Sequence, residues 1–491
     1  LPDWVSAKDV ILELLRRHDA DGGFGRIVEY HGPGLDSLSC MDRHVICNMG
    51  AELGATTSVF PSDQEVKRFL EQQGRGEDWI ELVADDDPGY DHTDRIDLSE
   101  LEPLIALPSN PDNVVPVREV AGRPIGQAYV GSSANPGYRD FAVAAEIVKA
   151  AGRQVPEHVS WDINPTSRQI LENLARDGHL LSLIASGARL HQAGCNGCIG
   201  MGQAPATDTI SLRTTPRNFE GRSGTKEDQV YLCSPETATA SALTGEITDP
   251  RDLEERFGIG YPRITERDDI LLNTEMLLAP PEDNEDVEIV KGPNISTIPD
   301  FDPLPDELTL PVVLKMGDDI STDHILRAGT EVLPYRSNIP EISKFAFDVV
   351  DDTYYDRAME TRESGDGHAV VGGVNYGQGS SREHAAIAPR YLGLRVAFVK
   401  EYARIHWQNL ANFGVLPLQF VSDDDYDAID QGDELQLTDL RSQLESGSEI
   451  EVENTTKGRT FTMKHTLSPR QVEMVLKGGI LNVMKEKLES R

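Results

Sequence analysis

QAYVGSSANPGYRDFAVAAEIVKAAG, residues 127–152, is the stretch that decides the fold class of this chain. It begins like a buried strand, continues through a turn of Gly, Ser, Asn and Pro, and ends with apolar residues at helical spacing. Residues 158–188 repeat this order, and residues 189–202 begin it again. Strands that alternate with helices predict an α/β fold with a largely parallel sheet. Its functional loops are expected at the carboxyl ends of the strands.

The wider sequence predicts several domains. A chain of 491 residues is long enough for two to four of them. Residues 277–306 carry six prolines and many acids with little helical period, which is typical of a linker. We expect an α/β domain over residues 1–115, a second over 116–276, and a C-terminal α/β domain over 307–491.

The composition excludes two kinds of partner. The 83 acidic and 46 basic residues give a formal net charge of −37, and the basic residues are 33 Arg and 13 Lys. Such an acidic surface repels nucleic acid and anionic membranes. No apolar run approaches the length of about 18 residues that a membrane span needs. A salt-adapted cytoplasm and an ordinary acidic enzyme both account for the charge.

The cysteines indicate a metal centre rather than a disulfide framework. Five cysteines in 491 residues are too few for disulfide bonding to organise the fold, so a reducing, cytoplasmic location is expected. In AGCNGCIGMG, residues 193–202, only Cys195 and Cys198 have the spacing of metal ligands. The flanking glycines leave room for an iron–sulfur cluster and for N–H donors to its sulfides. Half a zinc site, a redox dithiol and structural cysteines are the alternatives.

A second candidate site lies in VVGGVNYGQGSSREHAAIAPRYLG, residues 370–393. It reads as a strand, a glycine-rich turn and a helix that begins at the serines. The N–H groups of such a turn bind anions and can stabilise a serine alkoxide. Arg382 adjoins the serines and can hold a carboxylate through two parallel hydrogen bonds. A phosphate-binding loop or an ordinary helix cap is the alternative, although the lysine of a P-loop is absent.

A third constellation is SLRTTPRNFEGRSG, residues 211–224. Arg213, Arg217 and Arg222 lie there among small residues. Arginines in such a loop suit a polycarboxylate or phosphate ligand. Ordinary surface arginines are the alternative.

Together these motifs resemble the aconitase family, the iron–sulfur hydro-lyases that isomerise citrate and isocitrate. Eight blocks match in family order over nearly the whole chain. They are residues 27–40, 47–61, 194–200, 216–224, 231–240, 321–326, 375–386 and 403–418. The resemblance implies aconitase-like three-layer α/β domains, a cluster-bearing domain over 116–276 and a C-terminal swivel domain.

The resemblance also assigns roles to matching positions. Cys195 and Cys198 resemble two of three ligands of a 4Fe–4S cluster. The catalytic set is Ser380 as the base that removes a proton from carbon, Asp323 and His324 beside it, and Glu52. The substrate-binding set is Arg217, Arg222, Arg336, Ser381, Arg382 and Asn48, with Asn48 and Glu52 near the labile iron. The implied substrate is a tricarboxylate held by arginines during dehydration and rehydration.

The sequence departs from the family pattern in two places. Ser133, in the loop GSSANP at 131–136, stands where the family has its first cluster cysteine. An oxygen ligand from Ser133, a substitute thiolate from Cys40, Cys47 or Cys233, and a weak or absent cluster are all left open. The family's N-terminal domain, with its D-S-H motif, is also not matched. We expect that domain in cis or as a separate subunit, and this chain to be inactive without it.

Aconitate hydratase is the function that the resemblance favours. A homoaconitate or isopropylmalate hydro-lyase is the near alternative, and Arg336 favours a substrate with an outer carboxylate. A regulatory RNA-binding homologue and a non-catalytic domain are alternatives of another class. The charge of −37 argues against RNA binding.

Overall fold

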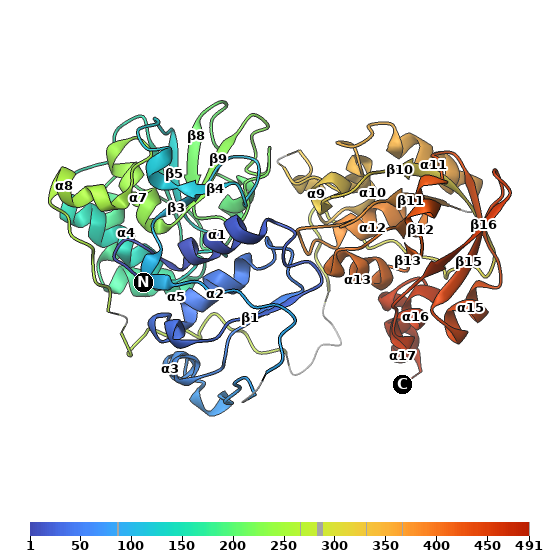
Figure 1. Ribbon diagram of the computed structural model, residues 1–491, viewed down its shortest axis with the longest axis horizontal. Coiled ribbons are helices and arrows are strands. Elements are labelled where there is room, and N and C mark those ends of the chain that lie inside the picture. The colour runs from blue at the N-terminus through green and yellow to red at the C-terminus, as the bar shows by residue number, and fades with distance from the viewer. Residues whose placement is uncertain (86–87, 266, 282–287, 330, 366, 491) are drawn as a thin grey trace. The chain divides into compact units, whose positions relative to one another are not determined.

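The computed structural model describes residues 1–85, 88–265, 267–281, 288–329, 331–365 and 367–490. The chain forms two compact units, Leu1–Glu285 and Asp286–Arg491 (Figure 1). Their boundary falls within the predicted linker. Residues 277–281 and 288–306 of that linker form neither helix nor strand, and its residues 282–287 lie outside the described part.

The first unit is built on a seven-stranded mixed sheet with the order β4-β3-β9-β8-β5-β6-β7. The five strands from β9 to β7 run parallel, and β3 is antiparallel to both of its neighbours. The strands are β3 (Leu104–Ala106), β4 (Val114–Pro116), β5 (Gln127–Gly131), β6 (Ser160–Asn164), β7 (Arg189–Leu190), β8 (Ile210–Arg213) and β9 (Gln229–Cys233). The division expected between residues 115 and 116 falls inside β4, so it does not separate two sheets.

Both faces of this sheet are buried. Ile105 and Tyr231 lie in one hydrophobic core, with α4 and α7, whereas their neighbours Leu104 and Leu232 lie in another, with α1 and α2. Successive side chains of a strand point to opposite faces, so the unit has three layers. A short parallel pair, β1 (Ile27–Glu29) and β2 (Thr57–Val59), lies outside the main sheet. The helices are α1 (Ala7–His18), α2 (Cys40–Met49), α3 (Gln64–Gln72), α4 (Tyr138–Ala151), α5 (Arg168–Arg176), α6 (His179–Ala185), α7 (Pro235–Thr244) and α8 (Leu253–Phe257).

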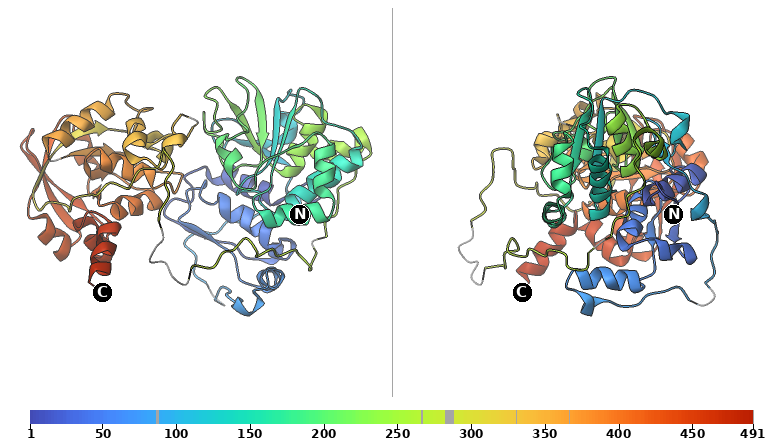
Figure 2. Two further views of the ribbon diagram at one scale, coloured as in Figure 1. Left: turned by 180° about the vertical axis from the view of Figure 1, so that it is seen from behind. Right: turned by 90° about the vertical axis from the view of Figure 1, so that its left-hand side faces the viewer.

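The second unit contains a closed seven-stranded barrel, β10-β11-β12-β13-β16-β15-β14 (Figure 2). The run from β10 to β13 is parallel, and antiparallel pairing of β14 with β10 closes the barrel. The strands are β10 (Leu308–Lys315), β11 (His368–Gly372), β12 (Leu394–Val399), β13 (Leu416–Phe420), β14 (Glu434–Leu437), β15 (Glu449–Asn454) and β16 (Arg459–Lys464).

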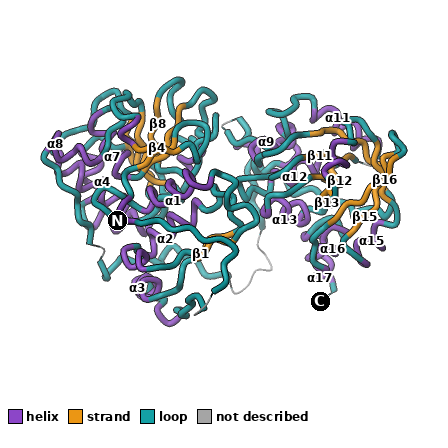
Figure 3. Tube along the Cα trace, in the orientation of Figure 1, coloured by secondary structure: helices purple, strands orange, loops and turns teal. Residues whose placement is uncertain are grey.

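Helices cover this barrel (Figure 3). Val371 and Phe398 belong to one core with β14, β15 and β16, whereas Val370 and Ala397 pack with α11 and α12. The helices are α9 (Thr322–Ile325), α10 (Ile339–Ile342), α11 (Tyr354–Ser364), α12 (His384–Tyr391), α13 (Arg404–Asn412), α14 (Asp423–Asp427), α15 (Leu440–Ser446), α16 (Pro469–Leu476) and α17 (Ile480–Glu489). Within the described residues, we find no helix with the length and apolar character of a membrane span.

Candidate functional site

One tight turn after β7 carries both cysteines, Cys195 at its start and Cys198 within it. Asn196–Ile199 forms a 3₁₀ turn, with Cys195 exposed and Cys198 buried. The Cys198 thiol, together with hydrogen bonds from Ser132 and Ser133, lowers the pKa of Cys195 to about 5. The same pairing and burial raise the pKa of Cys198 well above its usual range. The turn therefore presents one accessible thiolate beside one buried thiol.

The loop after β5 lies against this turn, as the parallel sheet predicts. The Ser133 N–H lies 3.4 Å from Cys195 Sγ, and Ser132 Oγ lies 3.6 Å from it. His44, on α2, contacts the Ser133 carbonyl at 3.1 Å. Ser132 was not predicted as a site residue, although it adjoins Ser133 in the same loop. Two hydroxyl-bearing residues therefore stand beside Cys195 where a third thiolate was expected.

The residues present fit an iron–sulfur group at two of its three expected protein ligands. N–H groups lie near both sulfur atoms: the Ser133 N–H near Cys195 Sγ, and Arg222 Nη2 at 3.9 Å from Cys198 Sγ. Within the described residues, no group of three or more His, Cys, Asp or Glu side chains is placed to hold a metal. Cys40, Cys47 and Cys233 therefore do not complete the set in this structure.

Arg217 and Arg222 follow β8, on the loop that faces the cysteine turn. Arg217 Nε donates to both carboxylate oxygens of the buried Glu52, at 2.7 and 2.9 Å. Gly200 of the cysteine turn packs directly on the Ser223 carbonyl, where a Cβ atom would clash. The segments that carry Glu52, Arg217, Arg222 and the cysteines therefore meet in the first unit. Asn48, partly buried near the end of α2, lies one turn before Glu52.

A buried lysine binds the backbone just after β8, on the segment that leads to Arg217. Lys8, on α1, is fully buried and donates to the carbonyls of Thr214 and Thr215 at 3.0 and 2.9 Å. Burial lowers its pKa to about 8. The ammonium therefore fixes the backbone just before Arg217 and adds positive charge beneath it. Its role was not predicted, because only the fold brings α1 to β8.

The second unit holds the serine loop between β11 and α12. The Ser380 N–H donates to Thr322 Oγ1 at 3.0 Å, and the Arg382 N–H donates to Ser380 Oγ at 3.3 Å. Arg382 Nη2 pairs with Asp323 Oδ1 at 2.6 Å. The structure thus brings Ser380, Arg382 and Asp323 together. The helix begins at His384, later than the serines at which it was expected.

Three further predicted residues lie around this loop. Arg336 is exposed, and its carbonyl accepts a hydrogen bond from His384 Nε2 at 2.6 Å. Ser381 is exposed, and its carbonyl accepts from Asn409. His324 Nδ1 accepts the Ser321 N–H in the cap of α9, so that ring nitrogen is already engaged. Thr322 and His384 were not predicted as site residues, although they lie in the blocks at residues 321–326 and 375–386.

Arg213 differs from its prediction. It was expected among the loop arginines that contact a ligand, but it is the last residue of β8 and is fully buried. Its side chain donates to backbone carbonyls of the cysteine turn rather than toward solvent. Arg213 is therefore not a substrate-binding residue.

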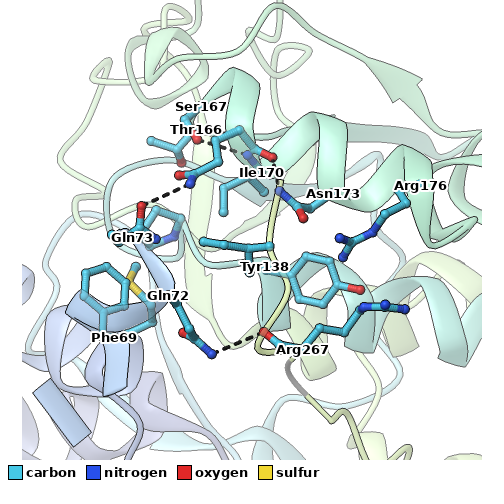
Figure 4. A pocket seen from close by; sticks show the side chains of 14 residues that line it. Phe69, Gln72, Gln73, Tyr138, Thr166, Ser167, Ile170, Asn173, Arg176 and Arg267 are labelled. Atoms are coloured by element: carbon cyan, nitrogen blue, oxygen red, sulfur yellow. Dashed lines mark hydrogen bonds between the residues drawn. The ribbon is translucent and has the colours of Figure 1, made fainter. Parts of the chain in front are cut away.

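A cavity of about 240 Å³ opens beside Pro136, between α3, α5 and residues 267–270 (Figure 4). Phe69, Tyr138 and Ile170 supply apolar walls. The two arginines that line the cavity form ion pairs with acidic residues of the same unit. Arg176 Nε binds Asp177 at 2.8 Å, and Arg267 Nη2 binds Asp269 at 2.6 Å. We do not assign this cavity to substrate carboxylates.

Comparisons with known proteins agree with the class that this fold and these residues indicate, an α/β hydro-lyase. The model of the aconitase family (aconitate hydratase) matches residues 1–124 and 118–245, and that of the aconitase C-terminal domain matches 338–423. The chain belongs to the aconitase family.

Individual relatives differ in their named substrates. Mitochondrial aconitate hydratase of Candida albicans is 33% identical over 99% of this chain and 69% of the relative. Mitochondrial homocitrate dehydratase of Saccharomyces cerevisiae is also 33% identical, over 98% of this chain and 69% of the relative. A solved 3-isopropylmalate dehydratase of Methanocaldococcus jannaschii is 27% identical and covers 38% of this chain and 97% of its own. Its TM-score of 0.30 is too low to add an argument.

Proposed function

We propose that this chain carries the dehydration–rehydration site of an aconitate hydratase, which interconverts citrate and isocitrate through cis-aconitate. The observation that carries the proposal is the joint placement of Ser380, Arg382 and Asp323 in one loop cluster. It supplies a base for the carbon-bound proton and a guanidinium for a carboxylate. Family membership makes the chain a hydro-lyase, and the tricarboxylate is the proposed substrate.

Ser380 acts as the base in this proposal. The Arg382 N–H points at Ser380 Oγ, so the charge of an alkoxide forming there is stabilised by an oriented donor. The alkoxide takes the proton from carbon and becomes the Ser380 hydroxyl, and a carbon–carbon double bond forms as the adjacent C–O bond breaks. The departing hydroxide takes a proton from solvent and leaves as water. Rehydration reverses these steps at the neighbouring carbon.

Arginines hold the carboxylates. Arg382 offers a planar fork that Asp323 already orients, and Arg336 lies exposed on the neighbouring loop. In the first unit, Arg217 Nε donates to both carboxylate oxygens of Glu52, which orients the guanidinium. Guanidinium groups match carboxylates bidentately and keep their charge at all physiological pH values.

Cys195 and Cys198 would hold the iron–sulfur group, with Ser132 or Ser133 supplying oxygen at the third position. When bound, such a group supplies Lewis-acid polarisation of the substrate hydroxyl.

The cytoplasmic location expected from the sequence stays a prediction. The two fungal relatives described above are named as mitochondrial.

Homocitrate dehydratase activity is the second candidate. The yeast relative with that name is as similar to this chain as the Candida aconitate hydratase. The two substrates differ by one methylene, which a pocket discriminates by only about 1–3 kcal/mol. Similarity alone therefore does not separate them.

A substrate panel tests the proposal. The natural polypeptide that contains this chain is loaded anaerobically with iron and sulfide. It is then given citrate, isocitrate, homocitrate and 3-isopropylmalate, with the unsaturated product followed by ultraviolet absorbance. We expect the highest kcat/KM with citrate and isocitrate. A preference of about tenfold or more for homocitrate would replace the first candidate with the second.

A further inference from the structure

Arg213 lies directly beneath the cysteine turn. Its side chain is fully buried, and its Nη1 donates to the Gly197 carbonyl, between the two cysteines, at 2.7 Å. Nη2 donates to the Gln203 carbonyl, just after the turn. One guanidinium thus holds the middle of the turn and its exit. A buried guanidinium bound to carbonyls is costly to desolvate, so these contacts must be satisfied for the unit to fold.

Tyr129 is the second side chain that packs beneath the cysteine turn. It lies on β5, next to β8, and the Arg213 guanidinium lies 5.3 Å from its ring centroid. A Cβ atom on Gly197 would lie 2.5 Å from Tyr129 Cε2, so only glycine fits there. The turn is therefore seated on two side chains of adjacent strands and has no room to shift toward the sheet.

A hydrogen-bonded chain extends from Arg213 to the entry of the turn. Gln127 Oε1 accepts from Arg213 Nη2 at 2.7 Å, and Gln127 Nε2 donates to the buried Asp162 at 2.9 Å. His191 Nε2 lies 2.8 Å from Asp162 Oδ1, and His191 precedes Cys195 on the same segment. This series of hydrogen bonds therefore connects both ends of the segment that carries the cysteines.

We propose that Arg213, linked through Gln127 and Asp162 to His191, is a positioning residue that fixes the separation and exposure of Cys195 and Cys198 before any metal binds. Arginine suits this position because its fork reaches both carbonyls at once. Lysine keeps the charge but not the fork, so it cannot hold the Gly197 and Gln203 carbonyls at fixed positions relative to each other. The inference concerns the metal-free chain, so it stands whether or not the proposed hydratase activity is correct.

The test compares Arg213→Lys with a matched control, Arg390→Lys. Arg390 is also buried and also donates to two carbonyls, those of Asp302 and Phe413, but in the second unit. Metal-free protein is alkylated with iodoacetamide, and Cys198 modification is followed by peptide mass spectrometry. Amide hydrogen exchange is measured over residues 196–203, where Gly200 and Met201 N–H groups are bonded within the turn.

We expect Arg213→Lys to raise Cys198 alkylation and exchange across 196–203 by about tenfold, while Arg390→Lys leaves both at the wild-type values. A folded Arg213→Lys protein with wild-type alkylation and exchange overturns the proposal, and so does an equal effect of Arg390→Lys.

A second pair of variants serves if Arg213→Lys does not fold. His191 is partly exposed at the far end of the same chain of bonds. His191→Leu removes the donor to Asp162 and should also raise Cys198 alkylation, while His191→Gln, which can donate, should restore it. Wild-type alkylation in His191→Leu overturns the linkage to His191.

Discussion

Arg382 Nη2 and Asp323 Oδ1 lie 2.6 Å apart, although 59 residues separate them in the sequence. Asp323 follows β10 and Arg382 follows β11, and these strands are parallel neighbours in the barrel. Their carboxyl-end loops therefore meet at one edge. The pair fixes the Arg382 guanidinium, and the backbone N–H of the same residue donates to Ser380 Oγ.

Arg382→Lys should lower kcat/KM for citrate by about 10²-fold or more, because an ammonium cannot reproduce the planar fork. The variant should unfold near the wild-type temperature, since the pair is partly exposed. Steady-state kinetics and thermal unfolding check this. Arg327→Lys, at a similarly exposed pair with Asp348 in the same unit, is the control and should keep its activity.

Arg336→Leu should lose preference for tricarboxylates and keep its iron content. An apolar side chain cannot bind an outer carboxylate, and Arg336 belongs to the unit without the cysteine turn. Substrate kinetics and iron analysis provide the two readouts. Arg441→Leu, at an exposed pair with Glu445, is the control. Loss of iron with an unchanged preference for citrate would place the specificity arginine elsewhere.

Glu52→Gln should destabilise the first unit by about 1–3 kcal/mol, because it leaves the largely buried Arg217 guanidinium without its carboxylate. Denaturant unfolding measures the change. Glu102→Gln removes a carboxylate from more exposed pairs with Arg118 and Arg251 and should cost less than about 1 kcal/mol. Equal losses would show that the Glu52 pair is not buried in solution.

Stability should fall as pH rises from about 4 to 7, in part through Asp9. Burial raises the pKa of Asp9 to about 7, so the folded state holds a proton that the unfolded state releases near pH 4. Its stabilising contribution is full below pH 4 and is lost as pH rises through 7. Asp9→Asn should therefore flatten the unfolding free energy across this window.

Asp351 should contribute to stability with the opposite pH dependence and serves as a comparison. Arg357 and Thr353 hold its pKa at about 2, so its contribution is present above pH 4 and is lost as pH falls toward 2. Asp351→Asn should leave the slope between pH 4 and 7 unchanged. If Asp9→Asn also leaves that slope unchanged, then Asp9 ionises normally in the folded protein.

Local signals in the sequence were sufficient for much of the fold. Ser6 and Asp9 form the capping box that starts α1, and such a box depends only on residues three apart in the sequence. The strand, loop and helix expected over 127–152 are β5, residues 132–137 and α4. The same signals placed Cys195 with Cys198 and Ser380 with Arg382, because each pair shares one loop.

Long-range contacts account for what the sequence did not predict. From the sequence, Arg213 was grouped with loop arginines. In the fold, its guanidinium donates to the carbonyls of Gly197 and Gln203, which lie earlier in the chain. Lys8 and Thr214 meet across 206 residues. Closure of the barrel depends on the pairing of β14 with β10, and a strand's period of two does not identify its partner.

The turnover of Ser380→Ala tests the central claim most directly. The loaded natural polypeptide and its Ser380→Ala variant are compared for conversion of citrate to cis-aconitate at saturating substrate, with iron content measured in both. The proposed role of Ser380 as base predicts a loss of about 10²–10⁴-fold in kcat with iron content unchanged. A kcat near the wild-type value would contradict it.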